Sequence, residues 1–390
     1  MNDDSDAFDW IDERLSALAD RHLMRKLHNS TPQQPGVVEL DGVQFVNFAS
    51  NDYLGLARDD RITKAVTRAV ETYGWGSGAS PLITGHTTLH RNLEVRLAEF
   101  EGCPSALLFP TGFAANVGVI TALADKSTTI FSDAKNHASI IDGCRLSGAN
   151  VVIYPHNDCE YLENELTKCK TRKLIVTDGL FSMDGDLAPI PEILRLAERH
   201  DAMLVVDEAH ATAVLGKNGR GSCEHFRVES DLIVRVGTLS KALGSLGGFI
   251  VGPRKVIDLC TNRSRTLIYS TAAPAAVCAA GLAALEIAES EPERRHHLLQ
   301  LADRLREQLK GTFDTLNSES QIVPIVLGEP DTTMQASSQL REAGFLVPGI
   351  RPPTVPPGES LLRVSLSYNH SVTMVDQLVS HLHRILGADN

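Results

Sequence analysis

Lys241 lies between two short apolar runs, residues 232–236 and 248–252, each of which predicts a buried strand. The segment between the runs is rich in glycine and carries the hydroxyl groups of Thr238 and Ser240. A lysine amine that is partly withdrawn from water has a lowered pKa and a free lone pair, which a Schiff-base lysine needs. An exposed loop lysine explains this stretch equally well, so the decision rests on the rest of the chain.

Polar side chains, or in one case the glycine-led start of a helix, follow several apolar runs of the chain, each at the point where the run ends. Because the carboxyl ends of parallel strands meet at one edge of a sheet, where such sheets bind ligands, we expect these side chains to lie close together. A single one can be a cap or a turn residue, whereas five converging strand ends indicate a site. The residues are Gly112 and Phe113 after 106–109, Asn136 and His137 after 130–131, Asp178 and Ser182 after 174–177, Asp207 and His210 after 203–206, and Thr238 after 232–236.

The elements that must position these residues alternate between strands and helices along residues 106–252. Such alternation predicts an α/β fold with a mostly parallel central sheet covered by helices on both faces. Ahead of it, residues 9–26 predict an amphipathic helix, and residues 37–48 predict a hairpin that turns at Asp41-Gly42. The chain is thus expected to divide into an N-terminal helix and hairpin segment (1–48), a large domain (49–289) and a smaller α+β domain (290–390).

Composition and charge exclude several classes of function. The chain has 390 residues and a formal net charge of −12, without a basic stripe, which argues against a nucleic-acid partner. Its first residues are acidic where a leader would be basic, and its most apolar long stretch, residues 272–288, predicts a buried helix rather than a membrane span. Seven scattered cysteines without a Cys-x-x-Cys pair predict a reduced, cytoplasmic protein without a metal site.

The types of the strand-end residues match what pyridoxal phosphate requires of a protein. This cofactor needs a lysine for its aldehyde, an anion at its ring nitrogen, a cradle for its phosphate and a side chain over its ring. Lys241 can supply the amine. Asp207 can supply the anion, which keeps the ring nitrogen protonated so that the ring draws electrons from a substrate carbanion. The phosphate suits Gly112, Phe113 and Thr238, the ring face suits His137, and the 3′ oxygen suits His210.

Six segments occur in order along nearly the whole chain: NDYLGL (51–56), TGFAAN (111–116), NHASI (136–140), FSMDGD (181–186), VVDEAH (205–210) and Thr238-x-x-Lys241. This set resembles the fold-type I pyridoxal-phosphate enzymes and, more narrowly, the α-oxoamine synthase family. The resemblance implies a pyridoxal-phosphate-dependent C-acyltransferase that is a homodimer with active sites at the subunit interface. The sequence departs from the family pattern at Ala79-Ser80-Pro81-Leu82, where local substrate contacts are therefore open.

The resemblance also implies a role for each residue. Lys241 carries the cofactor and removes the α-proton of the amino acid, Asp207 pairs with the ring nitrogen, and His137 stacks on the ring. Further cofactor contacts are expected from Gly112, Phe113, Ser182, His210 and Thr238, and substrate contacts from Arg25, His137, Arg351 and Thr354. Arg351 would take the amino-acid carboxylate with Thr354 nearby. Arg25 would meet the far end of the acyl chain, a position for which Arg21 and Lys26 compete.

Residues 350–356 (IRPPTVP) are most similar to the branch of that family that condenses L-alanine with pimeloyl-CoA or pimeloyl-acyl carrier protein. That reaction belongs to biotin biosynthesis and gives 8-amino-7-oxononanoate, carbon dioxide and the free thiol carrier. Alternatives within the family are glycine C-acetyltransferase and 5-aminolevulinate synthase, which use glycine, and acyltransferases that use serine. Outside it are a non-catalytic partner subunit of the same fold and a nicotinamide dehydrogenase, for which no G-x-G-x-x-G fingerprint lies between an early strand and a helix.

Overall fold

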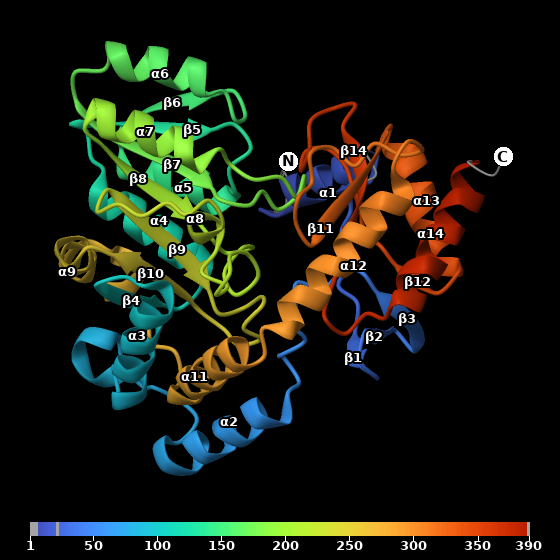
Figure 1. The fold of residues 1–390 in the computed structure, drawn as a ribbon, viewed down its shortest axis with the longest axis horizontal. Helices are drawn as coiled ribbons and strands as arrows, with labels where there is room; N and C mark the ends of the chain where they lie inside the picture. Colours follow the sequence, from blue (N-terminus) through green and yellow to red (C-terminus); the bar gives the residue numbers. More distant parts are fainter. Residues whose placement is uncertain (1–6, 21–22, 388–390) are drawn as a thin grey trace, which may run out of the picture.

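The computed structural model describes residues 7–20 and 23–387. The described strands form three sheets: a seven-stranded sheet in the central part of the chain, a four-stranded sheet built mostly by the N-terminal hairpin, and a three-stranded sheet near the C-terminus. Figure 1 shows the seven-stranded sheet and its helices on one side of the molecule and the two smaller sheets together on the other. Helix α12 (Glu293–Leu309) leads from the first group to the second.

The large sheet has the strand order β4-β10-β9-β8-β7-β5-β6. β10 (Gly248–Gly252) pairs antiparallel with both of its neighbours, whereas the strands from β9 to β6 pair in parallel. The predicted α/β fold with a mostly parallel sheet is therefore confirmed, with one reversed strand. The other strands are β4 (Ser105–Phe109), β5 (Thr128–Asp133), β6 (Asn150–Tyr154), β7 (Arg172–Asp178), β8 (Ala202–Asp207) and β9 (Ile233–Thr238).

Helices cover both faces of this sheet, as predicted. Successive strand residues point to opposite faces, so Leu174 and Val176 of β7 pack in one apolar core and Ile175 packs in another. The first core is completed by α4 (Gly112–Leu123), α5 (Ala138–Ser147) and α9 (Arg254–Arg263), and the second by α6 (Cys159–Lys168) and α7 (Ile190–His200). Two short helices, α8 (Ser222–His225) and α10 (Arg265–Ile268), lie in the connections.

Helix α11 (Ala275–Ser290) packs against α2 (Asp60–Tyr73) and α3 (Thr88–Glu101). Its alanine side chains are largely buried, which confirms the prediction of a buried helix for this stretch. None of the helices in the described ranges combines the length and the apolar character needed to span a lipid bilayer. A π-helical turn, η1 (Pro81–Gly85), precedes α3. All seven cysteines lie in the described ranges, and all are free thiols.

The N-terminal hairpin forms as predicted. β2 (Val37–Leu40) and β3 (Val43–Asn47) pair antiparallel around Asp41 and Gly42, whose φ angles of 49° and 85° suit a type I′ turn. β1 (Ser30–Pro32) pairs with β2, and β12 (Phe345–Leu346) pairs in parallel with β3. A C-terminal strand thus joins the N-terminal hairpin in one sheet, and the division of the chain after residues 48 and 289 stays a prediction.

The third sheet has the order β11-β14-β13, with β11 (Ile322–Gly328), β14 (Ser360–Ser365) and β13 (Gly349–Ile350) all antiparallel. Helices α12, α13 (Pro330–Glu342) and α14 (Val372–Leu386) pack around it. β12 is short, because only two of its residues pair, and they pair with β3 of the other small sheet.

Helix α1 (Asp9–Asp20) is shorter than the predicted helix over residues 9–26. The N–H of Leu23 donates to the carbonyl of Leu18 at 2.8 Å, and residues 23–29 form no helix. No side chain of α1 is buried, so no tertiary packing supports a longer helix. Arg25 and Lys26 therefore lie on an irregular segment after the helix.

Candidate active site

Lys241 lies in the loop between β9 and β10, at the carboxyl end of β9. Burial lowers the pKa of its amine to about 8, although the carboxylates of Asp207 and Asp178 oppose that shift. The side chain keeps some contact with solvent, but its amine makes no hydrogen bond to the described residues. Lys241 is thus a reachable amine of lowered basicity, close enough to two buried carboxylates to sense their charge.

Asp207 is the last residue of β8 and is buried. The side-chain N–H of Asn116, from α4, donates to its Oδ2 at 2.6 Å, and the backbone N–H of Ala209 donates to its Oδ1 at 2.8 Å. Asp178, at the end of the neighbouring β7, has its pKa raised well above the usual range by burial and by the charge of Asp207. Two N–H donors thus orient the Asp207 carboxylate at the end of β8.

His137 caps the N-terminus of α5, and its own N–H donates to Asp178 Oδ2 at 2.7 Å. A hydrogen-bond chain connects it to Asp207 through Asn116 and Ser139. The Asn116 amide donates to Asp207 and, at 2.9 Å, to the Ser139 hydroxyl, which lies 2.7 Å from His137 Nδ1. The backbone N–H of Ser139 also donates to Nδ1, at 3.2 Å, so Nδ1 is an acceptor and the Ser139 hydroxyl donates to it. The neutral imidazole therefore carries its proton on Nε2, and burial, which lowers the pKa of His137, favours this neutral form.

The start of α4 faces Thr238 across a narrow gap. A Cβ atom on Gly112 would lie 3.4 Å from Thr238, and the Thr111 side chain caps the helix by accepting from the N–H of Ala114. The N–H groups of Gly112 and Phe113 have no acceptor among the described residues. Two free N–H groups at the positive end of a helix, opposite a threonine, form a cradle for an anion such as a phosphate.

His210 is buried beyond Asp207 and meets a tyrosine from the N-terminal part of the chain. The Tyr53 hydroxyl lies 2.6 Å from His210 Nδ1, and it also donates to Asn51 Oδ1 at 3.1 Å. Burial lowers the pKa of His210 well below its usual range, and the charges of Lys241 and Arg363 act in the same direction. His210 is thus a neutral hydrogen-bonding group next to Lys241.

Arg363 is a site residue that our reading of the sequence missed. It lies on β14, is buried, and its charge contributes to the lowered pKa of both Lys241 and His210. Its Nε donates to the backbone carbonyl of Ser182 at 2.5 Å, whereas its terminal nitrogens lie at long distances, 3.4 and 3.5 Å, from Asn51 Oδ1. The available signal in the sequence was a single charged residue within an apolar run.

Arg25 and Arg351 do not join the Lys241 cluster. They line a cavity of about 580 Å³ between the end of α1 and the loop before β14, together with Thr354 and the apolar side chains of Leu15 and Leu18. Thr354 also lines a neighbouring cavity that contains Ser182 and Asn136. Thr354 thus lies between the two spaces. Arg21, which competes with Arg25 and Lys26 for the acyl chain, is outside the described residues.

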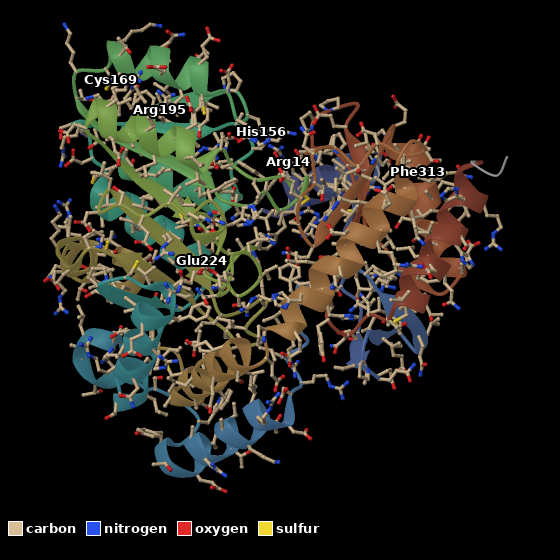
Figure 2. The ribbon with its side chains drawn as sticks, viewed as in Figure 1. Arg14, His156, Cys169, Arg195, Glu224 and Phe313 are labelled. Carbon is tan, nitrogen blue, oxygen red and sulfur yellow. The ribbon has the colours of Figure 1, made fainter. Side chains whose placement is uncertain are left out.

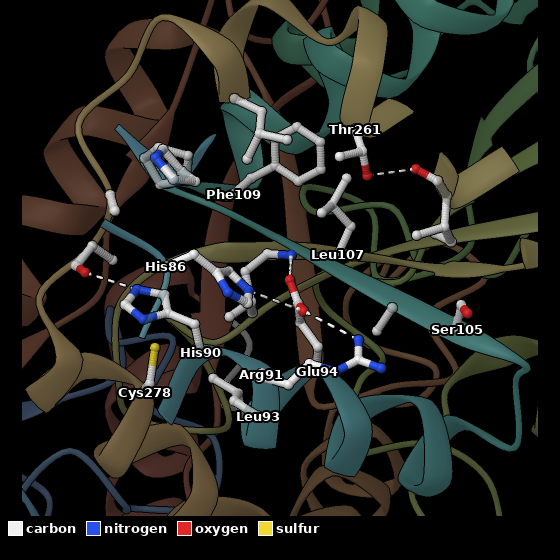
Figure 3. Close-up of a pocket in the computed structure, with 18 of the residues that line it drawn as sticks. His86, His90, Arg91, Leu93, Glu94, Ser105, Leu107, Phe109, Thr261 and Cys278 are labelled. Carbon is white, nitrogen blue, oxygen red and sulfur yellow. Dashed lines mark hydrogen bonds and ion pairs between the residues drawn. The ribbon is translucent and has the colours of Figure 1, made fainter. Parts of the chain in front are cut away.

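A different cavity, of about 410 Å³, is lined by Leu239 and Leu246 of the loop that carries Lys241. Figure 3 shows other side chains that line it, among them Glu94 of α3 and Phe109 of β4. Its polar side chains include Glu94 and His86, whose carboxylate oxygen and Nε2 are 3.2 Å apart. None of the predicted site residues lines this cavity. The candidate site is therefore defined by converging chemical groups rather than by the shape of this cavity.

The chain is similar to known proteins along nearly its whole length. The family model described as aminotransferase class I and II matches residues 43–382. The 8-amino-7-oxononanoate synthase of Anaeromyxobacter dehalogenans is 47% identical over 382 residues, which cover 97% of this chain and 96% of that protein. The 8-amino-7-oxononanoate synthase of Geobacter sulfurreducens is 46% identical over 376 residues, covering 95% and 96%.

Two solved structures are similar to the whole fold. Sphingomonas wittichii serine palmitoyltransferase aligns with a TM-score of 0.92 and 31% identity over 98% of this chain and 99% of that one. The 8-amino-7-oxononanoate synthase of Francisella tularensis aligns with a TM-score of 0.78 and 28% identity over 88% and 98%. These matches confirm the fold class expected from the sequence motifs.

Proposed function

Because the chain belongs to the 8-amino-7-oxononanoate synthase family within the class I and II aminotransferases, we propose that it condenses L-alanine with a pimeloyl thioester. The products are 8-amino-7-oxononanoate, carbon dioxide and the free thiol carrier, which is either CoA or acyl carrier protein. The cofactor is pyridoxal phosphate. The observation that carries the proposal is the Lys241 amine, with a pKa lowered to about 8 and within electrostatic reach of the Asp207 carboxylate.

The residues present fit pyridoxal phosphate. The Lys241 amine has no competing hydrogen bond among the described residues, and the N–H groups of Gly112 and Phe113 await an acceptor opposite Thr238. Asp207 is held by two N–H donors at the end of a buried strand, where it can keep a proton on the ring nitrogen. When bound, the cofactor supplies an electron-withdrawing ring that stabilises negative charge at the substrate α-carbon.

The chain's own groups then divide the acid and base work. The neutral Lys241 amine accepts the α-proton of alanine, because its lowered pKa of about 8 leaves about half of it deprotonated at pH 8. His137 presents an Nε2–H, which can donate to an oxygen that gains negative charge during the condensation. His210 stays neutral and can hydrogen-bond the cofactor's ring oxygen.

Arg363 is better placed than Arg351 to bind the alanine carboxylate. Arg363 is buried and senses the charge of Lys241, whereas Arg351 lines the cavity at the end of α1. The contacts of the Arg363 terminal nitrogens to Asn51 and Ser365 are long, 3.4 to 3.5 Å, which leaves their fork geometry for a carboxylate. The substrate role first expected for Arg351 is therefore reassigned in this proposal.

The cavity that contains Arg25 and Arg351 suits the far end of the acyl chain. A pimeloyl chain has an apolar middle and ends in a carboxyl or ester group. The cavity combines Leu15, Leu18 and Met24 with two guanidinium groups, and Thr354 connects it to the space next to Ser182. Apolar walls with cations at the end match that shape and charge.

Product analysis by mass spectrometry tests the proposed reaction. Alanine, glycine and serine would each be paired with pimeloyl-CoA, pimeloyl-acyl carrier protein and palmitoyl-CoA. We expect 8-amino-7-oxononanoate from alanine with a pimeloyl donor as the dominant product. Serine with palmitoyl-CoA is the second candidate, because serine palmitoyltransferase shares the whole fold. Equal or better turnover of glycine or serine contradicts the proposal.

We also propose that the protein is a homodimer and acts in the cytoplasm. Large apolar side chains are exposed on the turn η1 and after the neighbouring α10, namely Leu82, Ile83 and Tyr269. Exposed apolar side chains that gather in this way favour a subunit interface. Light scattering of the purified protein should give twice the chain mass of 42.3 kDa. A monomer that retains activity contradicts the interface.

A further inference from the structure

The imidazole of His156, just after β6, is bonded at both nitrogens by carboxylates. Nδ1 lies 3.0 Å from Asp133 Oδ1, and Nε2 lies 2.9 Å from Asp186 Oδ2. An ionised carboxylate can only accept a hydrogen bond, so both ring nitrogens carry protons and the ring is an imidazolium. Figure 2 shows His156 at the side of the large sheet that faces the smaller sheets.

Protein cations pair with the two carboxylates near His156 that a metal ion could otherwise use. Asp184, Asp186 and His156 place ligand atoms within 4.8 Å of one another, a spacing that a metal ion could use. However, Lys135 pairs with Asp184, and the His156 imidazolium pairs with Asp186. The cluster is therefore an ion-pair network. The other titratable groups around it are Glu359 near Lys135, Tyr154 and Cys159 near Asp133, and Asp158 at the start of α6.

Each carboxylate that holds His156 belongs to a different loop of the candidate site. Asp133 ends β5, and its carboxylate accepts from the backbone N–H of Lys135 at 2.8 Å, directly before Asn136 and His137. Asp186 ends the turn that begins at Phe181, because the N–H of Phe181 donates to the carbonyl of Asp186 at 3.0 Å.

Phe181 strengthens the link to the second loop. Its ring lies edge-on to the His156 ring, with centroids 4.4 Å apart. The backbone carbonyl of the next residue, Ser182, accepts a hydrogen bond from Arg363 Nε at 2.5 Å. A path of direct contacts thus runs from His156 through this turn to the guanidinium proposed to bind alanine.

We propose that the His156 imidazolium is a positioning residue that holds residues 133–137 and 181–186 together and so fixes where His137 and Arg363 stand. A protonated histidine suits this position because one small ring bonds two carboxylates in opposite directions. The amide of a glutamine has N–H donors on its nitrogen only, so it cannot donate to two carboxylates on opposite sides. A neutral imidazole has a single N–H, so it leaves one carboxylate without a donor. This inference rests on the site assigned under the proposed function.

The network also predicts how pH affects stability. Burial opposes the charge on His156, but its bonds to Asp133 and Asp186 outweigh burial and raise its pKa from 6.5 to about 9. A group whose pKa is higher in the folded state stabilises the fold fully below its unfolded pKa, and this stabilisation is lost as pH rises through the folded value. The contribution of His156 should therefore be complete below pH 6.5 and absent above pH 9.

Thermal unfolding of the His156→Gln variant against wild type tests this network without turnover. We expect the melting temperature of His156→Gln to be lower by about 2–6 °C at pH 6.5, a gap that closes by about pH 9.5. His225→Gln, which changes an exposed histidine, should follow wild type at every pH. A gap for His156→Gln that is independent of pH overturns the proposal. If His156→Gln does not fold, Asp186→Asn should show the same pH-dependent gap.

Steady-state kinetics then test the positioning role. His156→Gln should raise the KM for alanine about fivefold or more through a displaced Arg363, and it should lower kcat through a displaced His137. His156→Arg, which keeps the charge and can bond both carboxylates, should recover part of this loss. If the KM for alanine is unchanged in His156→Gln while its difference in melting temperature from wild type still disappears at high pH, the positioning role is contradicted but the ion-pair network stands. Because the thermal experiment uses no substrate, its outcome stands whichever amino acid the enzyme uses.

Discussion

The side-chain amide of Asn116 donates one hydrogen to Asp207 at 2.6 Å and the other to Ser139 at 2.9 Å. One residue of α4 therefore orients both the anion of the candidate site and, through Ser139, the tautomer of His137. Its remaining oxygen is buried without a partner among the described residues. Both N–H groups of Asn116 are committed, so its replacement affects two functional side chains at once.

Asn116→Ala should weaken cofactor binding. Hydrogen bonds to charged groups contribute about 1.5–3 kcal/mol, so we expect the dissociation constant of pyridoxal phosphate to rise by at least about tenfold. Absorbance titration of the apo-protein measures it. Ser139→Ala is the matched control, because it leaves both donors of Asp207 in place and should change the constant much less. Equal losses in the two variants would contradict the assigned role of Asn116.

The lowered pKa of Lys241 predicts how cofactor uptake by the apo-protein depends on pH. Only the neutral amine attacks the aldehyde, so the uptake rate should rise about tenfold per pH unit below pH 8 and level off above it. The rate is followed by stopped-flow absorbance. An ordinary lysine would let the rate rise until about pH 10.4, and a rise of that extent would show that burial does not set the basicity of this amine.

Two arginine variants separate the alanine carboxylate from the acyl carboxyl. Arg363→Lys should raise the KM for alanine by about tenfold or more, because a lysine cannot reproduce the bidentate fork. Arg351→Lys, the matched control, should leave that KM nearly unchanged and instead raise the KM for the pimeloyl thioester. The reverse pattern would restore the role that the sequence motif first suggested for Arg351.

Gly185 joins the turn at residues 181–186 to β11, and its replacement should loosen this junction. It has a φ of 70°, and an added Cβ would lie 2.1 Å from the carbonyl oxygen of Ile322. Gly148 has nearly the same φ, 69°, with no atom within 4 Å of an added Cβ. Backbone strain of about 1–2 kcal/mol is common to both alanine variants. In urea unfolding, Gly185→Ala should therefore lose at least about 1 kcal/mol more unfolding free energy than Gly148→Ala loses. Equal losses contradict a tight junction.

Much of the site could be predicted because its signals are local. Asp207 and Thr238 each end an apolar run that becomes a strand of one parallel sheet, so the rule for parallel strand ends brought them to the same edge. The hairpin turn at Asp41-Gly42 was likewise encoded by the residues that occupy it. Such features depend on neighbouring residues and need no knowledge of distant contacts.

The features that the sequence did not reveal depend on distant contacts. Pairing of β12 with β3 joins residues about 300 apart through only two positions, which leaves no periodic pattern. The predicted helix over residues 9–26 has apolar periodicity, but no side chain of α1 is buried, so the pattern overstated its length. Arg363 is recognisable only once β14 is seen next to Lys241, because its own neighbours in sequence are those of an ordinary strand.

The most direct test is to locate the residue that holds the cofactor. The protein would be saturated with pyridoxal phosphate, reduced with borohydride, digested and mapped by mass spectrometry. We expect the reduced adduct on Lys241, no adduct in Lys241→Ala, and a much weaker adduct in Asp207→Asn. An adduct on another lysine, or none on Lys241 in the saturated protein, would contradict the site described here.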